Sequence, residues 1–262
     1  MKTISATLWV ESHKVIKSKI FWLSIIFFLF VVFMIGLLMF VQKYPNLSGK
    51  LGMVGTKAMM LRLGDSNWKN YFNLLSQGMA GVGLVGYGFL TCWIFGREYS
   101  DHTIKDILAL PVSRSNIVLS KLIIIAVWCI LLSVIFFFFG ILTGQIIGIA
   151  GWSGKLVLQF TYKFAIVSLL SVLLCTPVAF FASYSGGFMA PMGFVIITMI
   201  AANFTGLVGL GPYFPWAIPG IYCTPSGTEE IHLGMISYII LFITSLIGLL
   251  GTITWWRFAD QK

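Results

Sequence analysis

The longest uncharged stretch of this chain places the strongest limit on its fold. Residues 164–228 are 65 consecutive positions without Asp, Glu, Lys or Arg. As one helix they would extend for about 97 Å, roughly three times the ~30 Å thickness of a bilayer core. The stretch must therefore fold back, and the Tyr-Ser-Gly-Gly sequence at residues 184–187 is the best turn within it. This predicts two spans, near residues 160–183 and 187–208.

Four other segments are each long and apolar enough to cross a membrane once. Residues 20–42, 70–96 and 122–154 are uncharged runs of 23, 27 and 33 positions, and about 20 apolar residues suffice for one span. A last apolar segment, near residues 233–256, ends at Trp255-Trp256-Arg257, a combination typical of a membrane interface. The prediction is an all-α membrane protein with six transmembrane helices.

The composition agrees with this class and excludes others. Only 10% of the residues are charged, against about 25% in soluble domains. Six spans leave no room in 262 residues for a nucleotide-binding domain, so residues 1–262 are predicted to form a single transmembrane domain. The net charge of +9 does not indicate nucleic-acid binding, because the basic residues flank the spans, where they meet lipid headgroups.

Residues 1–19 precede the first span and are predicted to form an amphipathic interfacial helix. Apolar residues repeat there at helical spacing, namely Ile4, Leu8, Trp9, Val15 and Ile16. The charged residues and the histidine are expected on other sides, namely Glu11, His13, Lys14 and Lys17. A basic amphipathic helix of this kind lies in the membrane interface. A disordered basic tail is the alternative.

Residues 97–114, called the charged island here, separate the second and third spans. Ile104, Ile107 and Leu108 fall on one side of a short helical pattern, opposite Lys105 and Asp106. Ser100 or Asp101 is suited to cap the start of this helix, and Pro111 stops it. A short capped helix between two spans is suited to contact a soluble partner.

Prolines mark two other places in the chain. Pro177 and Pro191 are expected to kink the fourth and fifth spans. Residues 209–227 hold four of the eight prolines, interleaved with aromatic residues. No regular span tolerates that density, so a re-entrant segment before the sixth span is predicted, with Pro215, Trp216 and Pro219 as its characteristic residues.

A stripe of glycines recurs every four residues in the third span. Its members are Gly140, Gly144 and Gly148. Small residues at this spacing allow two transmembrane helices to approach closely. The stripe is therefore predicted to be a helix-packing face.

The residue types needed for catalysis, metal binding or ion coupling are missing from the spans. No Asp or Glu falls inside a predicted span, which argues against an ion-coupled carrier. No histidines have metal-ligand spacing, and no nucleophile and base form a pattern. The Gly81–Gly86 glycine pattern lies in an apolar span without a preceding strand, so it indicates helix packing, not dinucleotide binding. A phosphate-binding loop is absent, so the chain is not expected to hydrolyse ATP.

The distribution of basic residues suggests an orientation. Of the 17 Lys and Arg residues, ten fall on the side of the two termini and seven on the other. The positive-inside rule therefore favours cytoplasmic termini. The loop at residues 42–73 opposes this, because it carries five of the seven.

Two segments resemble permease subunits of ABC-2-type ABC transporters, above all the bacitracin and lantibiotic resistance permeases. The first is the charged island, with Arg97-Glu98-Tyr99, Thr103, Lys105-Asp106, Leu108 and Leu110-Pro111-Val112-Ser113-Arg114, and it continues to Lys121. The second is similar to the same subfamily and consists of Tyr213-Phe214-Pro215-Trp216 and Pro219-Gly220. The six-span plan with a cytoplasmic helix between spans two and three also matches.

The resemblance implies a division of labour in the plasma membrane. Two permease chains, identical or different, would pair above two copies of a separate ABC-type ATPase, which would bind ATP and Mg. This chain would hold no cofactor, metal or catalytic residue. Its contacts to the ATPase would come from Arg97, Glu98, Tyr99, Asp101, Thr103, Ile104, Lys105, Ile107, Leu108, Pro111 and Arg114. Within this coupling helix region, Glu98 would pair with Arg114 or with a basic residue of the N-terminal helix.

The family's substrates include antimicrobial peptides and lipids, so export or clearance of such an amphiphile, as in resistance or immunity, is the predicted function. Two alternatives stay open. One is a secondary carrier or channel that works alone, and the other is a membrane sensor that only recruits an ATPase.

Overall fold

The computed structural model describes residues 2–44, 66–101, 103, 112–224 and 233–258. All named elements within these residues are helices. The extended backbone that pairs there is an isolated bridge between Asn67 and Ala150. The predicted all-α class is confirmed.

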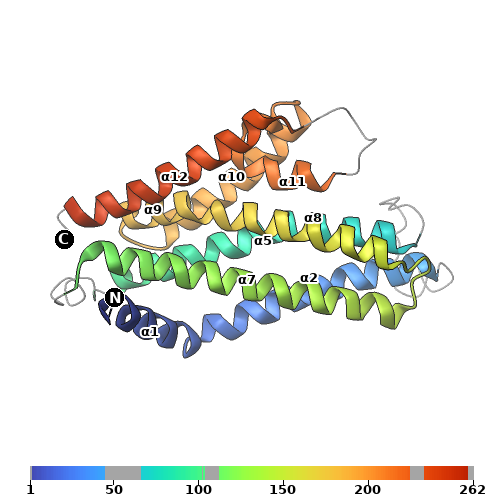
Figure 1. Cartoon of the computed structure of the whole chain (residues 1–262), viewed down its shortest axis with the longest axis horizontal. Helices are drawn as coiled ribbons and strands as arrows, with labels where there is room; N and C mark the ends of the chain where they lie inside the picture. The colour runs from blue at the N-terminus through green and yellow to red at the C-terminus, as the bar shows by residue number, and fades with distance from the viewer. Residues whose placement is uncertain (1, 45–65, 102, 104–111, 225–232, 259–262) are drawn as a thin grey trace.

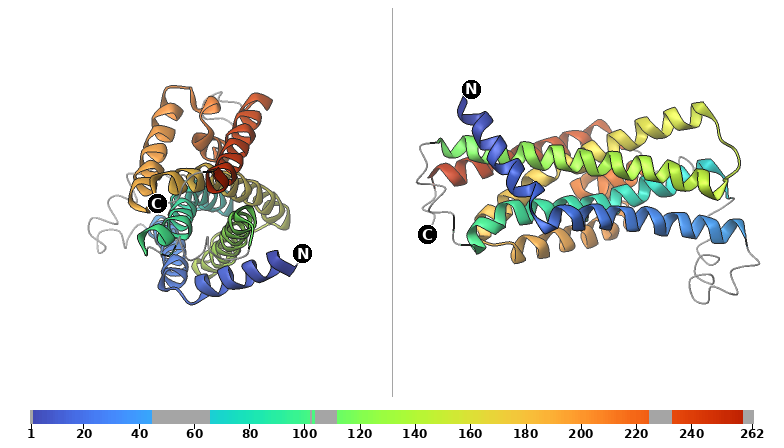
Figure 2. Two further views of the ribbon diagram at one scale, coloured as in Figure 1. Left: turned by 90° about the vertical axis from the view of Figure 1, so that its left-hand side faces the viewer. Right: turned by 90° about the horizontal axis from the view of Figure 1, so that it is seen from below.

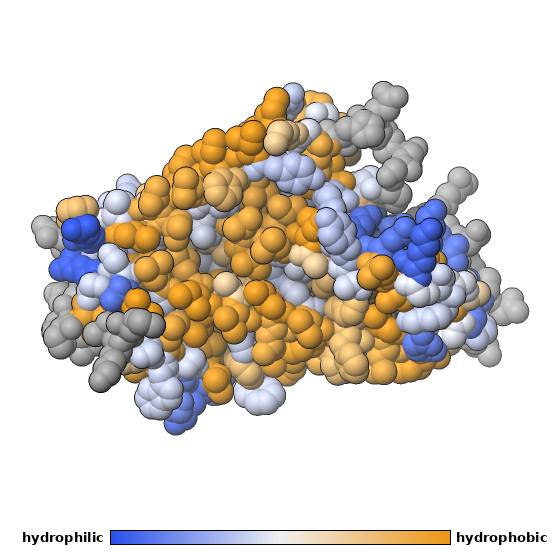
Figure 3. All heavy atoms as spheres, viewed as in Figure 1, coloured by the Kyte–Doolittle hydropathy of each residue, from blue (hydrophilic) through white to orange (hydrophobic). Residues whose placement is uncertain are grey.

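Within this described part, six helices are long and apolar enough to cross a membrane, as predicted. They are α2 (Lys19–Lys43), α5 (Trp68–Ser100), α7 (Arg114–Ile147), α8 with α9 (Gly154–Ser185), α10 (Met189–Leu207) and α12 (Met235–Phe258). The chain is a multi-pass membrane protein. Figure 3 shows a broad hydrophobic belt over the middle of the molecule, with hydrophilic residues concentrated at its two ends.

Helix α5 lies at the centre of the bundle. It packs against α2, α7, α8, α9 and α10, and a larger share of it is buried than of any other spanning helix. Its buried hydroxyls are satisfied within the helix, because Ser76 donates to the carbonyl of Phe72 at 2.9 Å and Thr91 to that of Tyr87 at 2.8 Å. Polar residues therefore enter the core at little cost.

Helix α1 (Lys2–Ile16) lies at an angle to the long helices and packs against α7 (Figures 1 and 2). Lys17 and Ser18 separate it from α2. Ser18 caps α2, since its hydroxyl accepts a hydrogen bond from the Phe21 amide at 3.3 Å. The start of α1 and the end of α12 lie at the same end of the bundle (Figure 1). We call this the terminal end and the other the opposite end.

The proline-rich segment forms three short helices. They are η2 (Gly211–Tyr213), η3 (Pro215–Ala217) and α11 (Ile218–Cys223), and each has a proline in its first two positions. Each proline lacks a backbone N–H to donate to the preceding turn, so one helix ends before it and a new one begins at or just before it. Pro215, Ala217 and Pro219 are buried, while Trp216 is half-buried.

The two expected proline kinks had different outcomes. The helix is interrupted at Leu174 between α8 (Gly154–Leu173) and α9 (Cys175–Ser185), three residues before Pro177. The hydroxyl of Thr176 donates to the Leu173 carbonyl at 3.0 Å, which Pro177 cannot bond. The kink expected at Pro191 is wrong, because this proline lies in the first turn of α10, where its missing N–H is not needed. The predicted turn is confirmed by the left-handed Gly186, with φ at 63°.

The glycine stripe of α7 divides into two roles. A Cβ atom at Gly140 would lie 3.0 Å from Leu75 Cδ1, and one at Gly144 would lie 2.5 Å from Trp68 Cη2, so both sit against α5. Gly148 is not on that face. It ends α7 with a left-handed φ of 67°, and the Lys43 ammonium donates to its carbonyl at 2.7 Å.

Candidate functional site

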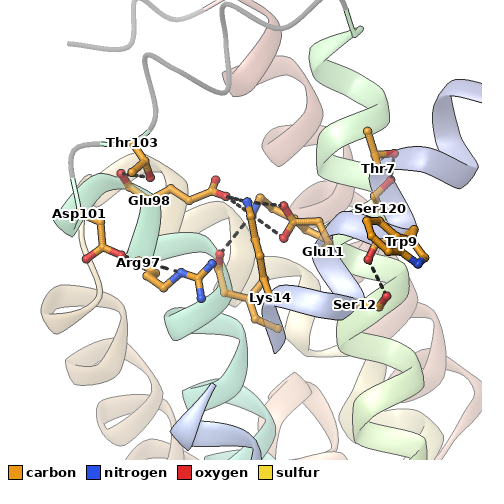
Figure 4. A network of polar contacts seen from close by, with 12 residues as sticks. Thr7, Trp9, Glu11, Ser12, Lys14, Arg97, Glu98, Asp101, Thr103 and Ser120 are labelled. Carbon is orange, nitrogen blue, oxygen red and sulfur yellow. Dashed lines mark hydrogen bonds and ion pairs between the residues drawn. The ribbon is translucent and has the colours of Figure 1, made fainter. Parts of the chain in front are cut away.

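Four charged side chains meet at the terminal end of the bundle. The Lys121 ammonium lies 2.7 Å from Glu98 Oε1 and 3.2 Å from Glu11 Oε2, and the Lys14 ammonium lies 3.0 Å from Glu11 Oε1 and 3.3 Å from Glu98 Oε1. Two carboxylates and two ammonium groups balance one another. We call Glu11, Lys14, Glu98 and Lys121 the charge cluster, and Figure 4 shows its polar contacts.

The cluster joins three helices at one point. Glu11 and Lys14 are one turn apart on α1, Glu98 is in the last turn of α5, and Lys121 is near the start of α7. The side chains of Lys121 and Glu98 are 1% and 2% exposed. Removing one partner of such a buried pair is strongly destabilising, since the other charge is left uncompensated. The cluster therefore fixes α1 to the ends of α5 and α7.

Glu11 corrects the predicted polarity of the N-terminal helix. The repeat of apolar residues placed Glu11 away from the packed side, but its side chain is 8% exposed and faces α7. Trp9 and Ile16 are instead exposed, with Trp9 stacked on His13. The buried lysine on α7 is the physical reason, because it needs an anionic partner from α1.

The ionisation of Glu11 follows from the same contacts. Burial by itself raises the pKa of this carboxyl. The Lys121 and Lys14 ammonium groups and their hydrogen bonds lower the pKa by more than burial raises it, so the net pKa is below the ordinary 4.5. A lowered pKa in the folded state means that the docking energy is fully present above the ordinary value and is lost as the pH falls through the lowered one.

We therefore expect α1 to stay docked at all pH values down to 4.5 and to release only in stronger acid. A fluorophore at His13→Cys would report this by its anisotropy, because His13 is exposed and the four native cysteines are buried. Adding Glu11→Gln should remove the acid transition. A release step between pH 6 and 8 would contradict this assignment, because a carboxyl whose pKa lies below 4.5 does not titrate there. Among the described residues, Glu11 shares the charge cluster with Glu98, Lys14 and Lys121.

The first half of the charged island is an extension of α5. Ser100 does not start a new helix, because its hydroxyl donates to the Gly96 carbonyl at 3.2 Å within the last turn of α5. Asp101 is the C-cap residue, with its amide donating to the Arg97 carbonyl at 2.8 Å. The Thr103 amide donates to the Glu98 carbonyl at 3.0 Å. These bonds close the end of α5 directly beside the charge cluster.

Arg97 and Asp101 form the exposed side of this helix end. The Arg97 guanidinium lies 4.8 Å from the Trp93 ring centroid and 3.9 Å from Asp101 Oδ2. The Asp101 side chain is 59% exposed, so this ion pair contributes little to stability. Asp101 is therefore available to a partner from outside.

The second end of the charged island is fixed to α12. Ser113 caps α7 by accepting a hydrogen bond from the Asn116 amide at 3.3 Å. The Arg114 guanidinium donates to the Trp256 carbonyl at 3.3 Å, near the last described residue of α12. Tyr99, from α5, makes an edge contact with the Trp256 ring. Both ends of the island are thus attached to neighbouring helices.

Of the two pairings expected for Glu98, the structure has the one with the N-terminal helix, through Lys14, while Arg114 bonds α12 instead. The coupling residues Ile104, Lys105, Ile107, Leu108 and Pro111 lie outside the described residues. Sequence reasoning missed Glu11 and Lys121 as site residues. The available signal for Lys121 was its position directly before the uncharged run at residues 122–154.

Over the described ranges, no group of three or more His, Cys, Asp and Glu residues is arranged to hold a metal ion. Within the charge cluster, Glu98 Oε2 is buried without a hydrogen-bond partner among the residues described.

Comparison with known proteins gives one family match and one similar curated protein. A family model described as "ABC-2 family transporter protein" matches residues 7–202, from α1 to α10. The chain is also 27% identical, over 180 residues, to a protein of Bacillus licheniformis named "Bacitracin transport permease protein BCRB". That match covers 68% of this chain and 86% of the relative.

Proposed function

Because this chain belongs to the ABC-2 family of transporter proteins, we propose that it is the permease subunit of an ATP-driven exporter. Membership implies association with an ABC-type ATPase, which would bind ATP and Mg. The chain itself would form the translocation pathway and catalyse no reaction. Two permease chains, identical or different, would assemble with two copies of the ATPase.

The observation that carries this proposal is the charge cluster. A short cytoplasmic segment transmits movement from an ATPase to membrane helices only where its ends are rigidly attached to them. The cluster ties the end of α5 to α1 and α7 through ion pairs of 2.7 to 3.3 Å, and Arg114 ties the start of α7 to α12. A displacement of the charged island would then move four helices together.

In this proposal the terminal end faces the cytoplasm and α1 lies in the membrane interface. The exposed Trp9, Val10 and Ile16 support interfacial contact of α1 with lipid. The segment at residues 209–227 would be re-entrant. Its helices of three, three and six residues are too short to cross a bilayer.

The proposed substrate is an amphiphile such as an antimicrobial peptide or a lipid. The similarity to a permease named for bacitracin transport supports this class. Export and release of such a compound from the membrane are both compatible with the proposal.

Co-purification with the ATPase encoded beside this gene tests the proposal. Asp101→Lys reverses an exposed charge beside the cluster, and Lys155→Asp reverses an exposed charge at the start of α8, on the opposite end. We expect the ATPase to co-purify with the wild type and with Lys155→Asp. Asp101→Lys should lower its yield about fivefold or more, which corresponds to about 1 kcal/mol of docking energy.

Absence of the ATPase from the wild-type preparation, together with substrate transport by the chain alone in liposomes, would overturn the proposal in favour of a secondary carrier. ATPase recruitment without any transport or resistance would instead indicate a sensor subunit.

A further inference from the structure

A polar cleft lies at the opposite end of the bundle from the charge cluster. It has a volume of about 450 Å³ and opens between α5, α8 and the end of α11. This volume is within the range of small-molecule sites. None of the functions proposed above for the charged island involves this cleft.

The cleft is built by matching faces of two parallel helices. Residues 69, 72, 73 and 76 of α5 and residues 156, 159, 160 and 163 of α8 line it, and both sets follow the spacing of one helix face. Phe72 and Phe160 stack on each other with ring centroids 4.2 Å apart and an angle of 7°. The two helices are thereby held at a defined separation around the cleft.

Lysines supply the charge of the cleft. Lys69 and Lys163 are the charged residues among its described lining, so that lining carries two positive charges and no carboxylate. The Lys163 ammonium donates to the Cys223 carbonyl at 2.8 Å and to Asn73 Oδ1 at 3.4 Å. Both acceptors are neutral, and no carboxylate of the described residues lies within ion-pair distance of Lys163.

The position of Lys163 makes the absence of a carboxylate among its described neighbours important. Lys163 is the tenth residue of α8, which places it about 14 Å along the helix from its first residue. A charge at this depth approaches the hydrocarbon region, where an ammonium without an anion is unfavourable. An anionic group in the cleft would compensate Lys163 and Lys69 together.

We propose that this cleft binds the phosphate-bearing headgroup of an anionic amphiphile. The two ammonium groups would contact the phosphate, with the amides of Asn73 and Gln159 as further donors. The apolar part would continue along the outer surface of α8, where Leu158 and Tyr162 are 73% and 70% exposed. The proposal deepens the function above by naming a substrate class and its site, but binding here requires no ATPase.

Native mass spectrometry of the full-length chain in a neutral detergent tests this. The probes are dioleoyl phosphatidylglycerol and, as the uncharged counterpart, dioleoyl phosphatidylcholine. We expect saturable binding of phosphatidylglycerol, at least tenfold tighter than that of phosphatidylcholine. Lys69→Gln should weaken it about fivefold or more. Lys155→Gln, an exposed lysine of α8 outside the cleft, is the matched control and should leave it unchanged.

Lys163 requires a separate design, because it also holds the end of α11 through the Cys223 carbonyl. Lys163→Gln should lose binding and Lys163→Arg should keep it, with equal thermal stability of Lys163→Arg and wild type as the check on folding. Equal phosphatidylglycerol affinity in wild type, Lys69→Gln and Lys163→Gln would overturn the proposal, as would an equal loss in Lys155→Gln.

A lipid headgroup and free phosphate both offer a phosphate group to the two lysines, and competition with inorganic phosphate distinguishes them. If millimolar phosphate fails to displace phosphatidylglycerol, the result supports an amphiphile as the ligand. Complete displacement would overturn the amphiphile assignment in favour of free phosphate. The lipid-binding measurement contains no ATPase, so the two proposals can fail separately. Loss of lipid binding in Lys69→Gln with normal ATPase co-purification would show that this site is separate from the proposed ATPase docking. Loss of ATPase co-purification with normal lipid binding would overturn the proposed docking alone.

Discussion

Lys121→Met is expected to abolish transport and to release α1 from the bundle. The substitution removes an ammonium that contacts Glu98, Glu11 and the Ile94 carbonyl within 2.7 to 3.4 Å. Two buried carboxylates would then share only Lys14, whose side chain is 31% exposed. Breaking a buried ion pair in this way costs about 3–5 kcal/mol. Limited proteolysis after α1, together with substrate efflux from cells, measures both effects.

The matched control for this variant is Lys155→Met, which removes an exposed lysine at the start of α8 and should leave efflux and proteolysis unchanged. The double variant Glu98→Gln with Lys121→Met tests the mechanism further. It removes one charge of each sign, so it should be less destabilised than the sum of the two single variants, Glu98→Gln and Lys121→Met, by a coupling energy of about 0.5–3 kcal/mol. Additive effects of the two substitutions would contradict a direct interaction between Glu98 and Lys121.

Gly248→Leu is expected to prevent assembly of the α9–α12 pair. A Cβ atom at Gly248 would contact the Pro177 nitrogen and lie 2.6 Å from both Pro177 Cα and the Thr176 carbonyl carbon. These are backbone atoms, so they cannot move aside as a flexible side chain does. The Thr176 hydroxyl also donates to the Ser245 carbonyl at 2.6 Å across the same contact. Overpacking of this kind costs about 1–3 kcal/mol, and more where backbone must shift.

Size-exclusion chromatography and thermal unfolding of the purified protein check this second prediction. Gly193→Leu on α10 is the matched control, since a Cβ there meets nothing within 4 Å. We expect the control to behave as wild type and Gly248→Leu to aggregate or to unfold at a clearly lower temperature. A monodisperse Gly248→Leu protein of normal stability would mean that α9 and α12 do not approach as closely as described.

The helices themselves were predictable because long apolar runs allow few alternatives. A run of 65 uncharged residues must fold back, and the turn falls at Gly186 as the local sequence indicated. The glycine period identified Gly140 and Gly144 on one face of α7, but Gly148 shares that spacing and has a different role at the helix end. Gly248, which makes the closest approach, belongs to no such repeat. Spacing reports which residues share a face, whereas the partner of that face depends on the three-dimensional packing.

The candidate site was likewise predictable from the sequence only in part. The charge pattern indicated the importance of residues 97–114, and the resemblance left Glu98 to pair with either Arg114 or a basic residue of the N-terminal helix. The apolar repeat placed Glu11 on the wrong side of that helix, and Lys121 was not included among the site residues. Both errors have one cause, since a buried charge is stable only with a partner that is distant in sequence: Lys121 and Glu11 are 110 positions apart.

The class of this protein, its six membrane-spanning helices and its resemblance to ABC-2 permeases could all be read from the sequence, because hydrophobic length and local motifs are properties of continuous segments. The folded bundle was needed to learn which charges are buried together at the end of α5, which glycines meet backbone, and that Lys69 and Lys163 line one cleft. Those facts depend on distances between helices, and such distances are set by the packing of the whole bundle.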